Sequence, residues 1–300
     1  MKEKIWAFLC HLGYNMWQDT TDYLLFERDV WEEVVADLRD AGCNMIVLDV
    51  GEGVRLDSHP EIAVRGSWTK DEMKTELARL RDMGFEVIPK LNFSTTHTQW
   101  TGPYARKIST SEFYAFQHDV VCEVAELFGR PRFFHIGYDE EFVEAQQNYP
   151  YVALRQGELW WHDLTVLCDC VESCGCRPWM WSDYLWKHEE EFLARMPHSV
   201  LQSNYFYGSF DETTGLPNAG SGARQYEILD RHGYEHIPCG YLQCVRENFP
   251  GTVTYCKKYL NDNLVLGYMQ TVWEPVTRQS LEKYRDAVAM FRKARQIYAD

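Results

Sequence analysis

Residues 132–141 read RFFHIGYDEE, in which a short apolar run leads into three consecutive carboxylic acids, Asp139, Glu140 and Glu141. The run is too short for a buried helix and is typical of a buried strand. Apolar residues at helical spacing precede it over residues 111–128 and follow it over residues 156–173. The stretch therefore predicts a strand between two helices, with acidic side chains directly after the carboxyl end of the strand.

The same alternation recurs along the whole chain. Further strands are expected at residues 5–10, 45–48, 85–91, 178–181, 199–203, 234–238 and 264–269. Helices are expected at residues 28–41, 189–195, 223–231, 251–260 and 278–298, and from a capping box at Thr69 and Glu72 to Gly84. Apolar strands that alternate with helices indicate a parallel sheet covered on both faces. Eight such units predict an α/β fold, a (β/α)8 TIM barrel, as a single domain over residues 1–300.

A doubly wound open sheet is the competing architecture. None of the expected strands is followed by G-x-G-x-x-G or by a phosphate-binding loop, which favours the barrel. Residues 51–67 and 204–222 carry no periodic pattern and are interpreted as loops between a strand and a helix.

The net charge of −15, with no long basic run, argues against nucleic acid and anionic membranes as partners, because both would be repelled on average. The chain has no stretch of about twenty apolar residues, and the apolar run at residues 5–10 is short for a signal peptide. The chain as written is therefore expected in the cytoplasm, while a leader removed earlier would leave no trace. The sequence indicates no oligomeric state.

Ten cysteines raise the question of a metal site. Most are isolated and are interpreted as small buried apolar residues. Cys168, Cys170, Cys174 and Cys176 form a C-x-C-x3-C-x-C cluster, which differs from the C-x2-C pairs typical of zinc sites. Since cysteines at i, i+2 of a helix point roughly 200° apart, the four are not expected to converge. No metal or other cofactor is predicted, and metal binding by this cluster stays an open alternative.

Polar and aromatic side chains follow the other expected strands as well. They include His11, Tyr14, Asp49, Glu52, Asn92, His97, Trp181, Asp183, Tyr205, Tyr207, Trp273 and Glu274. Because catalytic groups of such barrels lie at the carboxyl ends of strands, these residues predict an acidic cup with aromatic walls. This composition suits a sugar, and glycosidic cleavage needs an acid that protonates the leaving oxygen. The alternative for the acid triplet is a solvated loop that opens the next helix.

RFFHIGYDEE resembles the H-x-G-G-D-E signature of glycoside hydrolase family 20, the β-N-acetylhexosaminidases, with Tyr138 in place of the second glycine. Further similarity to this family occurs at residues 53–55, 59–62, 87–89, 123–128, 180–183 and 273–274. The resemblance covers nearly the whole chain as the family's catalytic barrel. It implies a glycosidase that removes terminal β-linked N-acetylhexosamine from a carbohydrate with retention of configuration and without a cofactor.

The resemblance also implies roles for single residues. The nucleophile is the substrate's own 2-acetamido oxygen, Glu140 is the general acid, and Asp139 stabilises the charge that develops on the acetamido group. The two acids then need different environments, with Asp139 ionised and the pKa of Glu140 raised. The residues implied for substrate binding are His135 near the acid loop, the pocket walls Trp181 and Trp273, Tyr205 or Tyr207 at the acetamido carbonyl, Asp183, and Glu274 at distal hydroxyls.

Two departures from the family bear on the substrate. Residues 8–14, FLCHLGY, lack the arginine with which the family grips the sugar, and residues 90–92, KLN, stand where acids are usual. Two alternatives therefore stay open. One is a barrel that binds glycans without cutting them, and the other is a glycosidase with an enzyme nucleophile, Asp49, Glu52 or Asp183. The pair of Asp139 and Glu140 favours catalysis, since binding alone does not require an acid beside a stabiliser.

Overall fold

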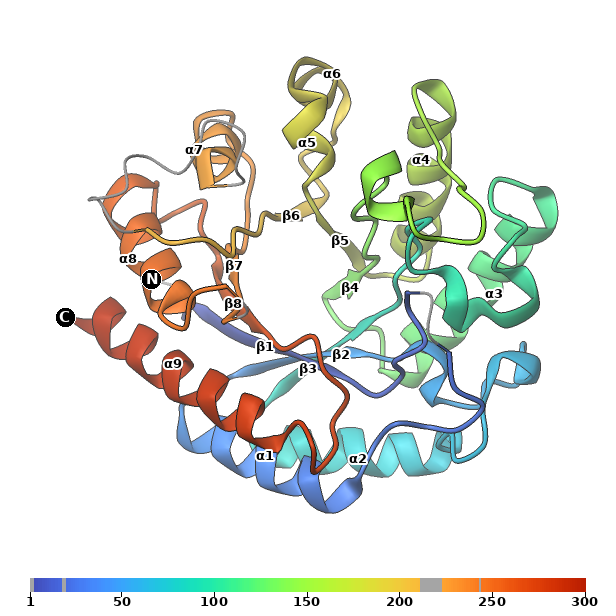
Figure 1. Ribbon diagram of the computed structural model, residues 1–300, viewed down its shortest axis with the longest axis horizontal. Coiled ribbons are helices and arrows are strands. Elements are labelled where there is room, and N and C mark those ends of the chain that lie inside the picture. Colours follow the sequence, from blue (N-terminus) through green and yellow to red (C-terminus); the bar gives the residue numbers. More distant parts are fainter. Residues whose placement is uncertain (1–2, 18–19, 211–222, 243) are drawn as a thin grey trace. The chain divides into compact units, whose positions relative to one another are not determined.

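The computed structural model describes residues 3–17, 20–210, 223–242 and 244–300 (Figure 1). Its strands are β1 (Ile5–His11), β2 (Met45–Asp49), β3 (Glu86–Lys90), β4 (Phe133–His135), β5 (Arg177–Trp181), β6 (Leu201–Ser203), β7 (Cys239–Gly240) and β8 (Gly267–Thr271). They form one 8-stranded sheet in the order β6-β5-β4-β3-β2-β1-β8-β7. Parallel bridges of Gln202 with His236 and of Tyr205 with Cys239 join the two ends of that order. This closed order of strands is that of the predicted (β/α)8 barrel.

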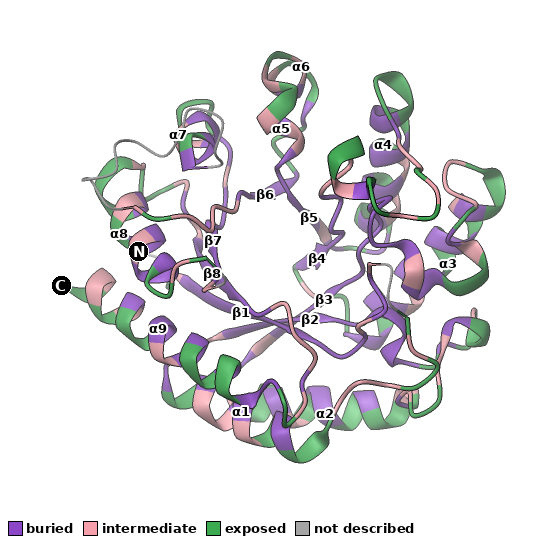
Figure 2. Cartoon of the chain, viewed as in Figure 1, coloured by how far each residue is buried: buried purple, intermediate pink, exposed green. Residues whose placement is uncertain are grey.

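Helices alternate with these strands. They are α1 (Arg28–Asp40), α2 (Lys70–Asp82), α3 (Ser111–Leu127), α4 (Glu158–Ser173), α5 (Tyr184–Lys187), α6 (Glu189–Arg195), α7 (Ala223–Arg231), α8 (Asn248–Tyr259) and α9 (Leu281–Ala299). Figure 2 shows that the strands are largely buried, whereas the long helices alternate between buried and exposed side chains. The capping box predicted for α2 is confirmed: the Thr69 hydroxyl accepts from the Glu72 backbone N–H at 3.2 Å, and the Glu72 carboxylate accepts from the Thr69 N–H at 2.8 Å.

The chain divides into two compact units. The first unit comprises Met1–Cys10, Glu27–Ile46 and Trp181–Asp300, and the second comprises His11–Phe26 and Val47–Met180. In the first unit β8 pairs in parallel with β1 and β7, and α9 packs on α8 and α1. In the second unit β4 pairs in parallel with β3 and β5, and α3 packs on α4. The expectation of a single domain over residues 1–300 stays a prediction.

The seventh strand lies later in the chain than the sequence pattern predicts. It was expected at residues 234–238, but β7 is Cys239–Gly240. His236 makes only isolated bridges, to Gln202 and Val265, among the described residues. The physical reason is Pro238, which has no N–H to donate and so interrupts the ladder directly before β7. Most of the loop predicted at residues 204–222 lies outside the described residues.

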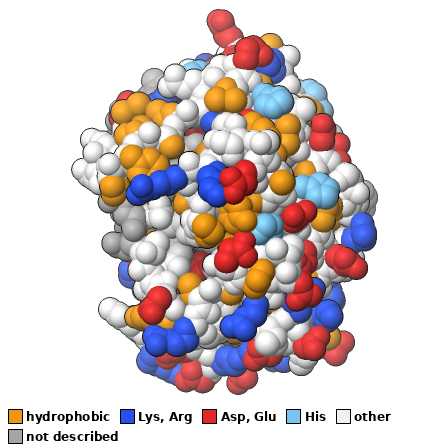
Figure 3. Space-filling view, turned by 90° about the vertical axis from the view of Figure 1, so that its right-hand side faces the viewer, with side chains coloured by type: hydrophobic (Ala, Val, Ile, Leu, Met, Phe, Trp, Pro, Cys, Tyr) orange, Lys and Arg blue, Asp and Glu red, His pale blue; other side chains and the backbone are white. Residues whose placement is uncertain are grey.

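Within the described part of the chain, no helix is long and apolar enough to cross a membrane. Acidic and basic side chains are interspersed on the face that Figure 3 shows. The net charge of −15 is therefore not gathered into one large acidic area on this face.

Candidate active site

The loop that follows β4 has an uncommon backbone conformation. Gly137, Tyr138 and Glu140 have φ angles of 69°, 73° and 58°, all in the left-handed region. A Cβ atom at Gly137 would lie 2.1 Å from Oδ1 of Asn92, so only glycine fits there. For Tyr138 and Glu140 this conformation costs roughly 1–2 kcal/mol each. Such strain persists only where the surroundings impose it, and it clusters at functional sites.

Asp139 is 5% exposed and is held by the loop that follows β3. The side-chain amide of Asn92 donates to its Oδ1 at 2.8 Å, and Nδ1 of His97 lies 3.7 Å from the same oxygen. The Thr96 hydroxyl donates to the backbone carbonyl of Asp139 at 3.2 Å. The orientation of the Asp139 carboxylate is therefore fixed before any ligand binds.

Glu140 lies in a different environment from its neighbour. Burial, reinforced by the charge of Asp139, raises the pKa of Glu140 to about 7. A carboxyl group with this pKa retains its proton in a large fraction of molecules at neutral pH, as a general acid must. The raised pKa predicted for Glu140 therefore has a physical cause in the structure.

These groups also have the spacing of a candidate cation site. His97, Asp139 and Glu140 each offer one ligand atom, and the three atoms lie within 4.8 Å of one another. A metal ligand must be deprotonated, so an ion at this position would have to displace the proton that the raised pKa of Glu140 retains. The pair can carry out proton transfer as long as no ion displaces that proton.

Glu141, the third acid, belongs to a buried ion network. Its carboxylate pairs with Arg155 and accepts from the backbone N–H of Thr95 at 2.8 Å. Arg155 also pairs with Asp163 of α4 at 3.3 Å and donates to the carbonyl of Phe93 at 2.8 Å. The three charged side chains are each 2% exposed or less. Glu141 therefore anchors the acid loop to α4 and to the loop after β3.

The two acids predicted after β2, Asp49 and Glu52, are also buried and have polar partners. Asp49 forms a buried ion pair with Lys90 and lies 3.4 Å from Nδ1 of His11. Although burial acts in the opposite direction, Lys90 and His11 lower the pKa of Asp49 to about 2. Glu52 is 2% exposed and accepts from the backbone N–H of Tyr14 at 2.7 Å, and burial raises its pKa.

His135 is fully buried at the end of β4. Its Nδ1 atom accepts from the backbone N–H of Gly137 at 3.0 Å, and its ring lies 5.0 Å from that of Trp179. Burial lowers the pKa of His135 well below its ordinary value, so the imidazole is neutral. These contacts suit a residue that orients the acid loop, while direct binding of substrate by His135 stays a prediction.

A cluster of predicted aromatic residues lies in the first unit. It comprises Trp181 at the end of β5, Tyr205 and Tyr207 after β6, and Trp273 after β8. The ring centroids of Trp181 lie 5.6 Å from Tyr205 and 6.0 Å from Trp273, and Nε1 of Trp273 donates to the Tyr207 hydroxyl at 3.1 Å. Trp181 is buried and the other three are partly exposed. We call these four residues the aromatic cluster.

Two further predicted substrate-binding residues also belong to this unit. Asp183 is 4% exposed and directly precedes α5. Glu274 is partly exposed and forms an ion pair with Lys283, and its backbone carbonyl accepts from the Tyr284 hydroxyl at 2.8 Å. A sugar hydroxyl that binds the Glu274 carboxylate would have to share it with Lys283.

The second unit contains a cavity of about 460 Å³ whose lining includes Arg106, Tyr149 and Tyr151. The guanidinium of Arg106 lies 4.5 Å from the ring centroid of Tyr151. Burial, followed by the charges of Glu140 and Asp139, raises the pKa of Tyr149 to about 12. The cavity wall at Tyr149 is therefore within electrostatic reach of the acid pair.

Sequence reasoning noted Asn92 and His97 only as polar residues after a strand, and it gave neither a role at Asp139. It did not single out Arg155 or Tyr149 at all. Both lie between β4 and α4, where no periodic pattern marks which side chains turn inward. The only sequence signal that could have found Asn92 and His97 is their position after β3, because the ends of neighbouring parallel strands meet at one edge.

Comparison with known proteins places the fold. No family model and no curated protein matches the sequence. The solved chitobiase of Flavobacterium johnsoniae is similar with a TM-score of 0.65 and 15% identity over 97% of this chain and 50% of that chain. A Vibrio harveyi exo-β-N-acetylglucosaminidase of glycoside hydrolase family 20, solved with N-acetylglucosamine, has a TM-score of 0.68 and 13% identity over 98% of this chain and 54% of that chain.

Dispersin B matches with a TM-score of 0.63 and 13% identity over 99% of this chain and 100% of that chain. The protein thus spans about half the length of the first two structures and the whole of the third. At this level of identity the likeness establishes the architecture. The predicted α/β fold is confirmed: the chain has the (β/α)8 barrel that these solved structures share.

Proposed function

We propose that the protein is a glycosidase that hydrolyses terminal β-linked N-acetylhexosamine by a retaining, substrate-assisted mechanism. The observation that carries the proposal is the pair formed by a buried, oriented Asp139 and a Glu140 whose pKa is raised to about 7. The resemblance of residues 132–141 to the family signature and the likeness of the barrel to solved hexosaminidases support it.

In the first step the acetamido oxygen of the substrate attacks the anomeric carbon while the bond to the leaving oxygen breaks. Glu140 transfers its proton to that oxygen, so the leaving group departs as a neutral alcohol. The acetamido nitrogen becomes positively charged as the oxazolinium ring closes. A hydrogen bond from its N–H to the Asp139 carboxylate strengthens as that charge develops.

In the second step Glu140, now a carboxylate, takes a proton from water. The water oxygen attacks the anomeric carbon, and the ring opens to restore the acetamido group. Two displacements at one carbon give a product with the β configuration of the substrate. Glu140 ends the cycle protonated, and a pKa near the working pH suits a group that must act as acid and then as base.

The aromatic cluster keeps the sugar-binding role predicted from the sequence. Partly exposed rings can cover the apolar face of a pyranose, and the Tyr205 or Tyr207 hydroxyl stays the proposed partner of the acetamido carbonyl. This assignment rests on the family resemblance of the residues that follow these strands.

A glycosidase with an enzyme nucleophile is less well supported. Asp49 is buried and ion-paired with Lys90, so its charge is already compensated, which weakens it as a nucleophile. Glu52 has a raised pKa, which weakens it as a nucleophile at neutral pH. A glycan-binding barrel without activity would not need the strained backbone that presents Glu140 beside Asp139.

A panel of three chromogenic glycosides tests the proposal. We expect release of chromophore from a β-N-acetylglucosaminide or a β-N-acetylgalactosaminide and little from a plain β-glucoside. Equal cleavage of the glucoside would favour an enzyme nucleophile. Binding of N-acetylated glycans without cleavage of any substrate in the panel would favour a non-catalytic barrel.

The remaining predictions concern the setting of this activity. The partner proposed is a carbohydrate with an N-acetylamino sugar, and neither nucleic acid nor a membrane is proposed. The cytoplasmic location and the single-domain organisation over residues 1–300 remain predictions from the sequence.

A further inference from the structure

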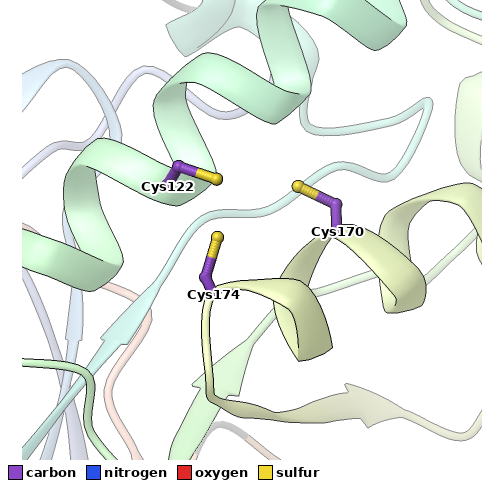
Figure 4. A group of neighbouring side chains, drawn as sticks. All are labelled: Cys122, Cys170 and Cys174. Atoms are coloured by element: carbon purple, nitrogen blue, oxygen red, sulfur yellow. The ribbon is translucent and has the colours of Figure 1, made fainter.

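Three cysteine side chains point toward one another between α3 and α4 (Figure 4). Cys122 comes from α3, and Cys170 and Cys174 come from α4 and its C-terminal end. Their sulfur atoms lie within 4.8 Å of one another, and all three are free thiols. The grouping differs from the one in the sequence: Cys168 and Cys176 are not part of it, whereas Cys122, which the sequence pattern left isolated, is.

The helical spacing explains why these side chains meet. Cys170 and Cys174 are four residues apart, as are His118 and Cys122, and residues at i and i+4 lie on one face of a helix. Because α3 packs on α4, the cysteines of the two helices point into one space. A two-helix site built from such pairs can supply up to four ligands.

His118 is not one of the group whose ligand atoms lie within 4.8 Å of one another, but it lies one turn before Cys122 and its side chain, 63% exposed, can rotate to supply a fourth ligand. Its Nε2 atom lies 3.8 Å from Sγ of Cys122, while its Nδ1 atom lies 3.3 Å from a carboxylate oxygen of Asp119. A carboxylate next to one ring nitrogen holds the proton there and leaves the other nitrogen able to bind a metal. This is the arrangement that metal-binding histidines commonly have.

The distances between the three sulfur atoms are close to those of a tetrahedral site. Zinc–sulfur bonds of about 2.3 Å place two sulfurs of a tetrahedron about 3.8 Å apart. The sulfur atoms, within 4.8 Å of one another, would have to approach by at most about 1 Å, which side-chain rotation can supply. A disulfide would join only two of the three sulfurs, at a distance of about 2 Å.

We propose that Cys122, Cys170, Cys174 and His118 bind one Zn²⁺ ion that links α3 to α4. Three thiolates and one imidazole form one of the usual ligand sets of structural zinc. The three cysteines are free thiols, so the ion displaces their protons when it binds, and its affinity increases with pH.

The site would stabilise the fold near the acid loop. Helix α3 precedes β4, and α4 follows the loop that carries Asp139 and Glu140. An ion that binds the folded chain but not the unfolded chain raises the free energy of unfolding, and this increase grows with the logarithm of the ratio of ion concentration to Kd. The ligands lie on helices and take no part in the proposed hydrolysis, so this proposal does not rest on the proposed function.

Cobalt substitution tests the site directly. The whole protein is reduced, freed of metal with a chelator, and titrated with Co²⁺ without oxygen. We expect one equivalent to bind with thiolate-to-cobalt charge-transfer absorption and the intense visible bands of tetrahedral Co²⁺, and Zn²⁺ to displace it. Zn²⁺ should also raise Tm, while removal of the metal should leave turnover at low temperature unchanged.

Variants separate the ligands from their neighbours. Cys170→Ala and Cys174→Ala should abolish the tetrahedral spectrum and the effect of Zn²⁺ on Tm. His118→Ala should keep the charge-transfer absorption but weaken Co²⁺ binding roughly a hundredfold, because the binding free energy of a structural site is shared among its ligands. Cys168→Ala is the matched control, since this buried cysteine lies on the same helix outside the group, and it should change none of these results.

Three results would overturn the proposal. The first is wild-type protein that binds no Co²⁺ in the reduced state, which needs no variant to fold. The second is a tetrahedral spectrum that survives Cys170→Ala or is lost in Cys168→Ala. The third is a disulfide between Cys122 and either partner in protein purified without oxidant, shown by peptide mapping.

Discussion

Asn92 and Asp139 are joined by a hydrogen bond of 2.8 Å from the side-chain amide to the carboxylate, across 47 positions of the chain. The carbonyl oxygen of the same Asn92 side chain accepts from the backbone N–H of Ser94 at 3.0 Å and of Tyr138 at 3.3 Å. One amide thus orients the carboxylate of Asp139 and also supports the left-handed backbone beside it. Residues 90–92 read KLN where acids are usual in the family that the sequence resembles. An ionised acid in place of Asn92 would repel Asp139, whereas the asparagine amide stabilises its charge.

Replacement of Asn92 by alanine should weaken catalysis. A hydrogen bond to a charged group contributes about 1.5–3 kcal/mol, so kcat/KM on a 2-acetamido glycoside should fall roughly 10- to 150-fold. Asn44→Ala is the matched control, because among the described residues the Asn44 side chain bonds to the backbone of Trp6 and Lys4, at 2.7 and 2.9 Å. Steady-state kinetics should show an unchanged kcat/KM for Asn44→Ala, and an equal loss in both variants would remove Asn92 from the site.

Replacement of Glu140 by glutamine should depend on the leaving group. A general acid contributes about 10²- to 10⁴-fold in rate when the leaving oxygen needs a proton. The loss should therefore be large for an alkyl glycoside and small for a dinitrophenyl glycoside, which departs without protonation. Glu144→Gln, at an exposed position on the same loop, serves as the control. Equal losses on both substrates would show that Glu140 is not the acid.

The pH dependence follows from the raised pKa of Glu140. The protonated, active form is present below the pKa and is lost above it, so kcat/KM should fall as pH rises through about 7. Asp139→Asn removes a negative charge that favours the protonated form, while the larger effect of burial remains. The pH at which kcat/KM falls should therefore be lower in this variant, yet still above the ordinary pKa range of glutamate. If kcat/KM of this variant falls at the same pH as in wild type or at a higher pH, the charge of Asp139 does not help to raise the pKa of Glu140.

The buried network around Arg155 should dominate the stability of the acid loop. Arg155→Met leaves Glu141 and Asp163 without their partner, which should lower the free energy of unfolding by about 3–5 kcal/mol. Arg39→Met is the control, because the Arg39 side chain is 53% exposed and its pair with Asp40 should contribute less than about 1 kcal/mol. Urea denaturation measures both. Similar small effects would mean that the Arg155 network does not anchor the loop.

The repeated strand and helix pattern made the barrel predictable, because each unit buries a short apolar run next to an amphipathic helix. The error at β7 has a local cause, since Tyr234–Pro238 has the composition of a strand but Pro238 cannot donate to a ladder. The acid pair was predictable because Asp139 and Glu140 follow an apolar run directly. The backbone at Tyr138 could not be predicted from the motif. The family signature has a glycine at this position, and Tyr138 adopts the left-handed conformation typical of glycine, with a φ of 73°.

The partners of the acid pair could not be predicted in the same way. Arg155 lies in an irregular segment, and its contacts with Glu141 and Asp163 depend on how three separate elements pack. The cysteine grouping failed for a related reason. The sequence grouped Cys170 and Cys174 with Cys168 and Cys176, whereas the packing of α3 on α4 brings Cys122 to Cys170 and Cys174.

Substrate assistance is the central claim, and inhibition by the thiazoline of N-acetylglucosamine or N-acetylgalactosamine tests it most directly. This compound mimics the cyclic intermediate, with its ring nitrogen placed to face the Asp139 carboxylate. We predict that it inhibits wild type far more tightly than the parent sugar does, and that Asp139→Asn removes roughly 2–4 kcal/mol of this preference while binding of a 2-hydroxy sugar barely changes. A thiazoline that inhibits wild type no better than the parent sugar would contradict the claim.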